Sequence, residues 1–185
     1  MEEYIFEKSR AGFAADHEIL TLHSGWKLIS KLTMEDKVAI LIPTEKGERV
    51  EYQNPEEIQK YKYKGEMYQI KNKKLNLCVT PNHSLYVKKD GIFQFLEAKE
   101  IFGKDVKFKN LSEEFEKREE RVERERVERE EREEREEREE REEREEGEER
   151  EEEWISYEGN VYYCTVESGI IYIRRKEKQA VWCGN

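Results

Sequence analysis

The sequence predicts an all-β fold, and three patterns carry this prediction. Apolar residues alternate with polar ones in many short runs, which is the period that buries one side of a β-strand. Turn-forming pairs such as Ser-Gly, Asn-Pro and Asp-Gly stand between these runs. The runs follow one another at a spacing of about ten residues, which is typical of all-β proteins built from short strands.

The expected strands of the first half are separated by clear turn signals. Ser24-Gly25 and Asn54-Pro55 mark two of the boundaries. A continuous apolar run at residues 37–42 is consistent with a buried strand, and we expect Pro43 to end it because proline has no N–H for a sheet. The strands expected here cover residues 18–22, 27–32, 37–42, 49–52, 58–64 and 66–71.

The second half of the sequence also predicts short strands, two of which flank a turn at residues 80–83. Strands expected at residues 75–79 and 85–87 flank residues 80–83, where the proline marks a turn. Asp90-Gly91 predicts a hairpin, and residues 95–102 are expected to form a short helix that Gly103 stops. The remaining expected strands are 106–108, 154–157, 161–166 and 170–174, with breaks at 158–160 and 168–169.

Residues 113–153 differ from the rest of the chain in composition. They hold 25 acidic and 12 basic residues, in a chain whose formal net charge is −10. Glu-Glu-Arg repeats place Glu131 four residues before Arg135, a pairing that stabilises a helix by about 0.2–0.5 kcal/mol. We expect a solvated helix, although about 40 helical residues would span about 60 Å. A break at Gly147, a flexible return or a domain swap would let the flanking strands rejoin one body.

Composition excludes several classes of function. No apolar run approaches the roughly 18 residues of a membrane span, and no signal peptide is evident. Outside the charged segment the chain is nearly neutral, with no basic face to suggest nucleic-acid binding. The cysteines Cys78, Cys164 and Cys183 are odd in number and lack metal-ligand spacing, which argues against zinc or a disulfide framework and favours an intracellular, reducing location.

The corner formed by Thr80-Pro81-Asn82-His83 is the main candidate site. It holds a hydroxyl and an imidazole at a turn braced by two strands, where a peptide carbonyl or amide could be bound. A histidine at a strand end is more often structural. The motif therefore indicates a functional site only if the two ends of the chain supply groups on which it could act.

Both ends of the sequence carry further short motifs. Residues 12–21 read GFAADHEILT, and residues 161–166 and 181–185 read VYYCTV and VWCGN. Together with residues 80–83 they resemble the splicing blocks of inteins, the self-excising members of the hedgehog/intein (Hint) family. The likeness is greatest to mini-inteins of eukaryotic and large-virus genes, and it covers roughly residues 12–110 and 154–185.

The resemblance implies a horseshoe-like all-β Hint fold with a charged, helical insertion. Residues 1–11 would be a remnant of the upstream flank, or N-extein. Residues 12–110 and 154–185 would form the two parts of the splicing domain. Residues 111–153 would be a linker in the place of a lost homing endonuclease. A coiled-coil partner site is the alternative for that linker, but a period of three without apolar a and d positions speaks against it.

The resemblance also implies autocatalytic splicing by acyl shift, transesterification and asparagine cyclisation. The first residue, normally Cys, would attack the Ala11 carbonyl at the Ala11–Gly12 junction, and Gly12 has no side chain to do so. The first step is therefore expected to be blocked in this precursor. We favour an engineered replacement at position 12, because the rest of the block is kept; a natural degenerate copy is the alternative.

The other expected roles follow the matching blocks. Thr80 and His83 would polarise the upstream peptide, Asp16 would shape the first strand, and Asn185 would cyclise and cut the chain. Gly184 stands where the family usually has histidine, and Tyr163 stands where most members have aspartate. The donor for cyclisation would then be Cys164, His17 or water, and the sequence does not choose among them.

This activity would be single-turnover self-processing rather than that of a turnover enzyme. It needs no cofactor, metal or small-molecule ligand, and its partners would be its own flanking segments in cis, with neither nucleic acid nor a membrane involved. Its location would follow the host protein, cytoplasmic or nuclear. The alternative is a non-catalytic β-domain with a charged helical arm that acts as a spacer or interaction module. Splicing requires His83, the Ala11–Gly12 peptide and Asn185 to converge on one pocket.

Overall fold

The computed structural model describes residues 11–111, 114–116 and 152–185, and in them strands predominate, which confirms the all-β prediction. Every strand pairing in this part of the chain is antiparallel. The first strands are β1 (Phe13–Ala14), β2 (His17–Thr21), β3 (Gly25–Leu28), β4 (Val38–Thr44), β5 (Gly47–Gln53), β6 (Glu57–Lys71) and β7 (Asn76–Val79). The later strands are β8 (Ser84–Lys89), β9 (Ile92–Glu97), β10 (Lys107–Lys109), β11 (Glu114–Glu116), β12 (Glu152–Thr165), β13 (Ile170–Arg175) and β14 (Val181–Gly184).

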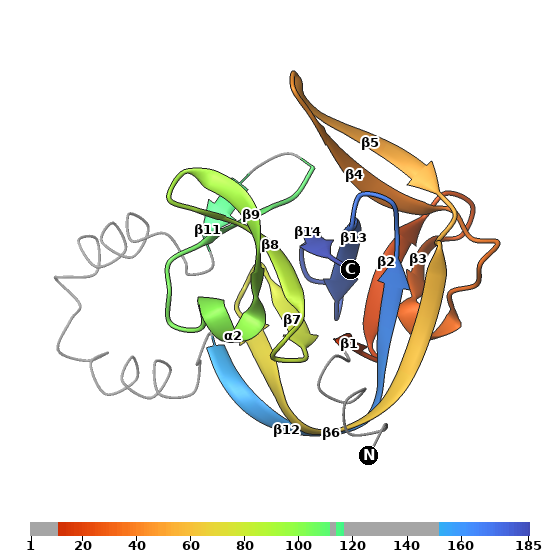
Figure 1. The fold of residues 1–185 in the computed structure, drawn as a ribbon. Helices are drawn as coiled ribbons and strands as arrows, with labels where there is room; N and C mark the ends of the chain where they lie inside the picture. Colours follow the sequence, from red (N-terminus) through yellow and green to blue (C-terminus); the bar gives the residue numbers. More distant parts are fainter. Residues whose placement is uncertain (1–10, 112–113, 117–151) are drawn as a thin grey trace, which may run out of the picture.

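A long two-stranded ribbon connects the two sides of the molecule. Strands β6 and β12 pair from Glu57↔Thr165 to Ile70↔Glu152, and the ribbon curves beneath the body like the base of a horseshoe (Figure 1). One side carries β4 and β5, and the other carries β8, β9 and the short helix α2 (Ala98–Ile101). Strand β1, strand β14 and the C-terminus lie between these two sides (Figure 1).

Strand β1 is short, but it closes the central barrel. It pairs with β12 through Phe13↔Tyr162 and with β7 through Phe13↔Val79, so the order β1-β12-β6-β7 returns on itself. The C-terminal strand β14 pairs with β13, which in turn pairs with β2. Segments from the start, the middle and the end of the sequence therefore meet at the centre of the fold.

Two glycines that we expected near strand breaks instead lie inside the ribbon. Gly159 lies within β12 opposite Tyr63, and Gly65 lies within β6 opposite Tyr157. Both have positive φ angles, of 153° and 158°, and a tyrosine two residues earlier covers each of them. The hydroxyl of Tyr157 donates to the Asn160 carbonyl at 2.7 Å, so the ring bridges the glycine. The break expected at residues 158–160 was wrong, because all three residues pair with β6 inside a continuous ribbon.

Three other boundaries also differ from the expectation. Pro43 does not end its strand, because β4 continues to Thr44 in the outer part of the hairpin with β5. The helix expected at residues 95–102 forms only over α2, from Ala98 to Ile101, because residues 95–97 still belong to strand β9. The strand expected at residues 27–32 turns into a 3-10 helix, η1 (Ile29–Lys31). Strand β11 lies inside the range expected for the insertion, and the rest of the helical prediction for that range falls mostly outside the described residues.

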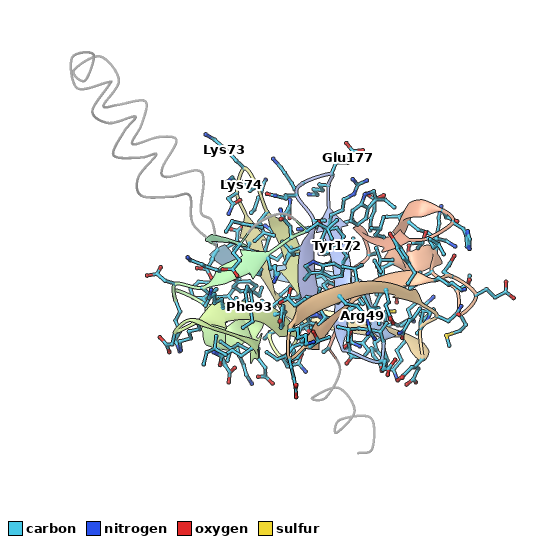
Figure 2. The ribbon with its side chains drawn as sticks, turned by 90° about the horizontal axis from the view of Figure 1, so that it is seen from above. Arg49, Lys73, Lys74, Phe93, Tyr172 and Glu177 are labelled. Carbon is cyan, nitrogen blue, oxygen red and sulfur yellow. The ribbon has the colours of Figure 1, made fainter. Side chains whose placement is uncertain are left out.

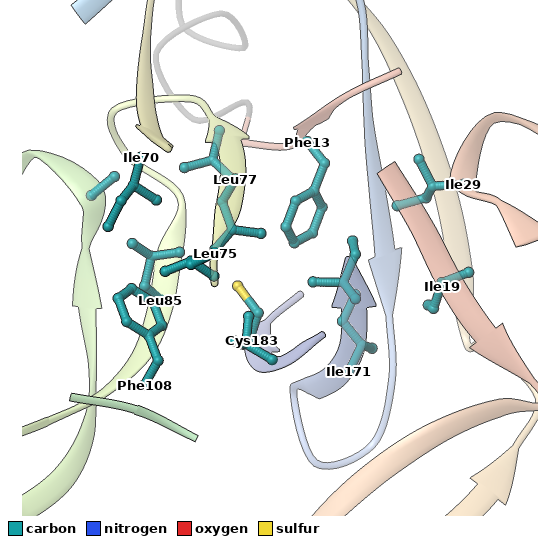
Figure 3. Packing of buried hydrophobic residues seen from close by; sticks show 14 of the residues in the cluster. Phe13, Ile19, Ile29, Ile70, Leu75, Leu77, Leu85, Phe108, Ile171 and Cys183 are labelled. Carbon is teal, nitrogen blue, oxygen red and sulfur yellow. The ribbon is translucent and has the colours of Figure 1, made fainter. Parts of the chain in front are cut away.

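The main hydrophobic core fills the space around β1. Figure 3 shows Phe13 between Leu77 on one side and Ile19 and Ile29 on the other, with the Cys183 sulfur directed into the same cluster. Phe13 is fully buried. Burial of such a ring contributes about 1.5–3 kcal/mol, so packing holds the first described strand firmly against the body.

Two turns meet at one edge of the molecule. The β6–β7 turn carries Lys73 and Lys74, and the β13–β14 turn carries Glu177; both project at the upper edge of Figure 2. The Gln179 amide donates to the Lys74 carbonyl at 2.8 Å, which ties the two turns together. Within the described residues no helix is long and apolar enough to cross a membrane.

Candidate functional site

The corner at residues 80–83 is a hydrogen-bonded turn held by a helix end. The His83 amide donates to the Thr80 carbonyl at 3.0 Å. The Ala98 and Lys99 amides, at the start of α2, donate to the His83 and Pro81 carbonyls at 2.9 Å each. Amides in the first turn of a helix have no partner within the helix. Helix α2 therefore uses its free amides to fix the corner.

Thr80 contacts the upstream peptide directly. Its Oγ1 accepts a hydrogen bond from the Gly12 amide at 3.1 Å, and its own amide donates to the Gly12 carbonyl at 3.0 Å. The Gly12 nitrogen belongs to the Ala11–Gly12 peptide, which is the expected junction. Thr80 is fully buried, so this peptide group is held in a defined orientation away from water.

The backbone packs closely around Gly12. A Cβ atom at this position would lie 2.8 Å from the Tyr162 carbonyl oxygen and 3.1 Å from the Val161 Cβ. These atoms belong to β12, which pairs with β1 immediately beside Gly12. A side chain at position 12 therefore requires a small shift of β12.

His83 contacts the downstream end of the chain. Its Nε2 lies 2.8 Å from the Gly184 carbonyl oxygen, and because a carbonyl only accepts, Nε2 carries the proton. Its Nδ1 is therefore an acceptor, and it is buried with no partner in the part of the chain that the structure describes. The Phe13 ring packs against the imidazole at 4.3 Å between centroids. Complete burial lowers the pKa of His83 to about 4, so the ring is neutral near pH 7.

Asn185 is held through both its backbone and its side chain. Its amide donates to the Gly169 carbonyl at 3.0 Å. The Tyr163 hydroxyl donates to the Asn185 Oδ1 at 3.3 Å, and the Tyr163 ring lies 6.3 Å from the His83 ring. The Ala11–Gly12 peptide, His83 and the final carboxamide thus belong to one connected cluster.

Gly184 has no room for a side chain. A Cβ atom there would overlap the Ser84 carbonyl oxygen, which is backbone and cannot swing aside. Ser84 follows His83 directly, so the corner itself fills the space beside Gly184. The close approach of β14 to the corner, with His83 bonded to the Gly184 carbonyl, therefore depends on glycine at position 184.

Cys164 lies away from this cluster. Successive residues of a strand face opposite sides, so Cys164 points away from the side that carries Tyr163. It is buried in the main hydrophobic core, and burial raises the pKa of its thiol to about 12. Burial also raises the pKa of Cys78 to about 11 and that of Cys183 well above its ordinary value. None of these thiols is a ready nucleophile near pH 7.

Asp16 takes part in a separate polar network around Arg175. The guanidinium Nε lies 2.9 Å from both Asp16 oxygens, and Nη1 donates to Gln69 Oε1 at 2.8 Å and to Asn76 Oδ1 at 3.0 Å. Burial alone would raise the pKa of Asp16, but the hydrogen bond and charge of Arg175 bring it below its usual value. Arg175 thereby ties the β1–β2 turn to β6, β7 and β13.

His17 has both ring nitrogens engaged. Its Nδ1 donates to the Ala14 carbonyl at 2.8 Å, and its Nε2 accepts from the Cys78 amide at 3.1 Å. Complete burial lowers the pKa of His17 to about 3. These contacts describe a neutral ring that braces β1 against β7, rather than a donor available to Asn185.

Two site residues were not among the candidates chosen from the sequence. Tyr163 was noted only as a departure from the family pattern, and Arg175 lies just beyond the strand expected at residues 170–174. A signal for Tyr163 existed, since it alternates with the buried Cys164 and so had to face the opposite side. In the described part of the chain, no group of three or more His, Cys, Asp or Glu side chains is placed to hold a metal ion.

The two buried histidines predict acid sensitivity. Their pKa values fall from the ordinary 6.5 to about 3 for His17 and about 4 for His83, so the unfolded chain binds protons before the folded chain does. The contribution of the two neutral histidines to the free energy of unfolding is fully present above pH 6.5. It falls as the pH drops towards 4, by up to about 1.4 kcal/mol per pH unit for each histidine. Urea denaturation across a buffer series measures this slope. A stability that stays constant from pH 7 to pH 4 would contradict the assigned neutral rings.

Comparisons of the sequence give two curated relatives, while no protein-family model matches. The chain is 43% identical over 101 residues to the ATP-dependent Clp protease proteolytic subunit of Chlamydomonas moewusii. It is 41% identical over 101 residues to the DNA-directed RNA polymerase subunit beta C-terminal section of Stigeoclonium helveticum. These matches cover 52% and 50% of this chain but only 10% and 9% of those proteins.

Comparison of the structure identifies the fold. A splice-inactive variant of the AceL NrdHF class 3 split intein has a TM-score of 0.62 at 14% identity, covering 94% of this chain and 97% of its own. The bacterial intein-like domain from Clostridium thermocellum also scores 0.62, at 17% identity, and covers 96% and 100%. An intein from a hyperthermophile scores 0.60 at 13% identity, with 95% and 100% covered. The described body therefore has the Hint fold of inteins, as the sequence predicted.

Proposed function

We propose that this chain is an intein-type domain that processes its own backbone in cis, with its first step blocked at Gly12. The observation that carries the proposal is the convergence of both chain ends on one corner. Thr80 holds the upstream peptide at the Gly12 nitrogen, and His83 holds the Gly184 carbonyl one peptide before Asn185. Autocatalysis on two distant bonds requires such an arrangement, because one site must reach both.

The sequence relatives support the same proposal. They are named as a protease subunit and an RNA polymerase subunit, and the shared segment is about a tenth of each. Proteins with such different activities have no reason to share a catalytic segment of this size. An inserted element carried by different hosts explains the match. Residues 1–11 would then be upstream flank, and residues 111–153 a linker between the parts 12–110 and 154–185.

Upstream, Thr80 orients the junction but Gly12 supplies no nucleophile. Acyl transfer would need a thiol or hydroxyl at position 12 to attack the Ala11 carbonyl while the Gly12 nitrogen leaves. The hydrogen bond between the Gly12 amide and Thr80 Oγ1 places a hydroxyl at that leaving nitrogen. The junction is thus prepared for chemistry that the residue at position 12 cannot begin.

Downstream, Asn185 has the required chemistry. Its Nδ2 attacks its own main-chain carbonyl carbon, the new C–N bond closes a succinimide, and the bond to the following residue breaks. The proton lost from Nδ2 ends on the departing amine, so the step needs no cofactor. His83 positions this residue by fixing the peptide that precedes it. We assign Asp16 and Cys164 to the stability of the fold, because their contacts lie elsewhere.

Restoring a thiol at position 12 tests the upstream half of the proposal. We expect the Gly12→Cys chain to release residues 1–11 when dithiothreitol is added, at least about tenfold faster than the Gly12→Ala chain. Both variants introduce a Cβ that lies too close to the Tyr162 carbonyl, so both should lose about 1–3 kcal/mol of stability. Intact-mass measurement separates the thiol chemistry from the shared packing cost.

The outcome also distinguishes the alternative function. A folded Gly12→Cys chain that keeps residues 1–11 with dithiothreitol would contradict the upstream role of the corner. If a protein fused after Asn185 also stays attached, the non-catalytic spacer becomes the better account. Equal release from the Cys and Ala variants would show cleavage that does not depend on a nucleophile at position 12.

A further inference from the structure

We propose that Tyr163 is a catalytic residue of the downstream cleavage, with its hydroxyl activating the carboxamide of Asn185. This inference rests on the proposed function and names the group that takes the place of a histidine at position 184. The hydroxyl donates to Oδ1 of Asn185 at 3.3 Å, so it touches the group that reacts. The sequence alone left this donor open among Cys164, His17 and water.

The fold leaves little choice of donor. A side chain at position 184 would overlap the Ser84 carbonyl, so the residue next to Asn185 cannot assist. The Nε2 proton of His83 is already given to the Gly184 carbonyl, one peptide away from the bond that breaks. Cys164 is buried in the core on the opposite side of β12, and His17 uses both of its nitrogens elsewhere.

Tyr163 is also held firmly in position. It sits in the β6–β12 ribbon, paired with Gln59, and its ring meets the His83 ring edge-on at 78° between planes. Asn185 is fixed from the other side by the hydrogen bond from its amide to the Gly169 carbonyl. With Oδ1 bound to the phenol and the backbone bound to Gly169, the direction of Nδ2 is restricted. Such preorganisation is a main source of rate enhancement for an intramolecular step.

The hydrogen bond stabilises the charge that the reaction creates. When Nδ2 gives up a proton to attack the main-chain carbonyl carbon, negative charge spreads onto Oδ1. An O–H donor fixed at Oδ1 in a partly buried site stabilises that charge more strongly than bulk water would. Burial, followed by nearby Cys164 and Glu57, raises the pKa of Tyr163 above its ordinary value, so the phenol keeps its proton near pH 7.

The test uses the chain extended after Asn185 by a reporter protein. We expect Tyr163→Phe to slow release of the reporter by about 10- to 100-fold, since it removes one donor and keeps the ring. Tyr63→Phe is the matched control, because it removes a hydroxyl bonded to the Glu66 carbonyl at 2.6 Å on the same ribbon, away from Asn185. The control should release the reporter at the unsubstituted rate within about twofold.

A pH profile separates catalysis from a structural role. The advantage of the unsubstituted chain over Tyr163→Phe should shrink at alkaline pH, where the phenol ionises and stops donating. Equal rates for the two chains near pH 7 would overturn this inference alone. A ratio that does not change with pH would also overturn it, since it would indicate packing rather than proton donation. No release from the unsubstituted chain would overturn the proposed function and this inference with it.

Discussion

Replacing Asn185 with Ala is expected to abolish release of a protein fused after residue 185. Succinimide formation needs the Asn185 carboxamide nitrogen as nucleophile, and alanine has none. We expect a loss of at least about 10³-fold, because removing the nucleophile from a self-acting site leaves only background hydrolysis. Intact-mass measurement of the fused chain over time gives both the rate and the position of the cut.

The matched control for this substitution is Asn185→Asp. Aspartate keeps the shape of the side chain and an oxygen that can accept from the Tyr163 hydroxyl. It lacks the carboxamide nitrogen, so it should also fail to cyclise in the same way. Both variants should unfold at the same denaturant concentration as the unsubstituted chain. Release from Asn185→Ala at an undiminished rate would show that another group cuts the chain.

The second large effect is expected at Arg175, and it concerns stability. Replacing Arg175 with Met should lower the free energy of unfolding by about 2–4 kcal/mol. The substitution removes the donors that serve Gln69, Asn76 and Asp16, and it leaves their oxygens without that partner in a mostly buried place. The loss is expected to be smaller than for a fully buried pair, because the Asp16 side chain is 43% exposed. Urea denaturation measures the loss.

Arg174 provides the control within the same strand. It carries the same charge, donates to Glu18 at 3.1 Å and lies over the Trp26 ring at 4.4 Å, with more of its side chain exposed. Arg174→Met should cost no more than about 1 kcal/mol. Equal losses at the two positions would contradict the assignment of Arg175 as the residue that ties the β1–β2 turn to the barrel.

The sequence predicted the fold class well because the core signals are local. The alternation in residues 18–22 corresponds closely to β2, and the apolar run in residues 170–174 corresponds closely to β13. The long ribbon was missed because Gly65 and Gly159 stand between apolar runs, where a glycine usually indicates a turn. Each glycine is instead covered by the tyrosine two residues before it in the same strand, and the pairing of β6 with β12 runs past both glycines without a break.

The sequence predicted less of the site than of the fold. The motif at residues 80–83 was expected to act on the upstream peptide through both Thr80 and His83. Thr80 does contact the Gly12 nitrogen, whereas the Nε2 of His83 bonds to the Gly184 carbonyl at the other end of the chain. The hydrogen-bond partner of His83 depends on where β14 packs beside the corner. Residues so far apart in the sequence give no local signal of that packing. The role of Tyr163 likewise follows only from its contact with Asn185, which is also a long-range contact.

One measurement tests most directly whether the two chain ends share a self-processing site. The chain with a protein fused after Asn185 is incubated, and the mass of each product is determined. Self-processing at Asn185 predicts a product that ends at residue 185 as a succinimide, one water molecule lighter than the hydrolysed chain. This product should still carry residues 1–11, because Gly12 cannot start the upstream step. A fused chain that stays intact, or one cut at a residue other than 185, would contradict it.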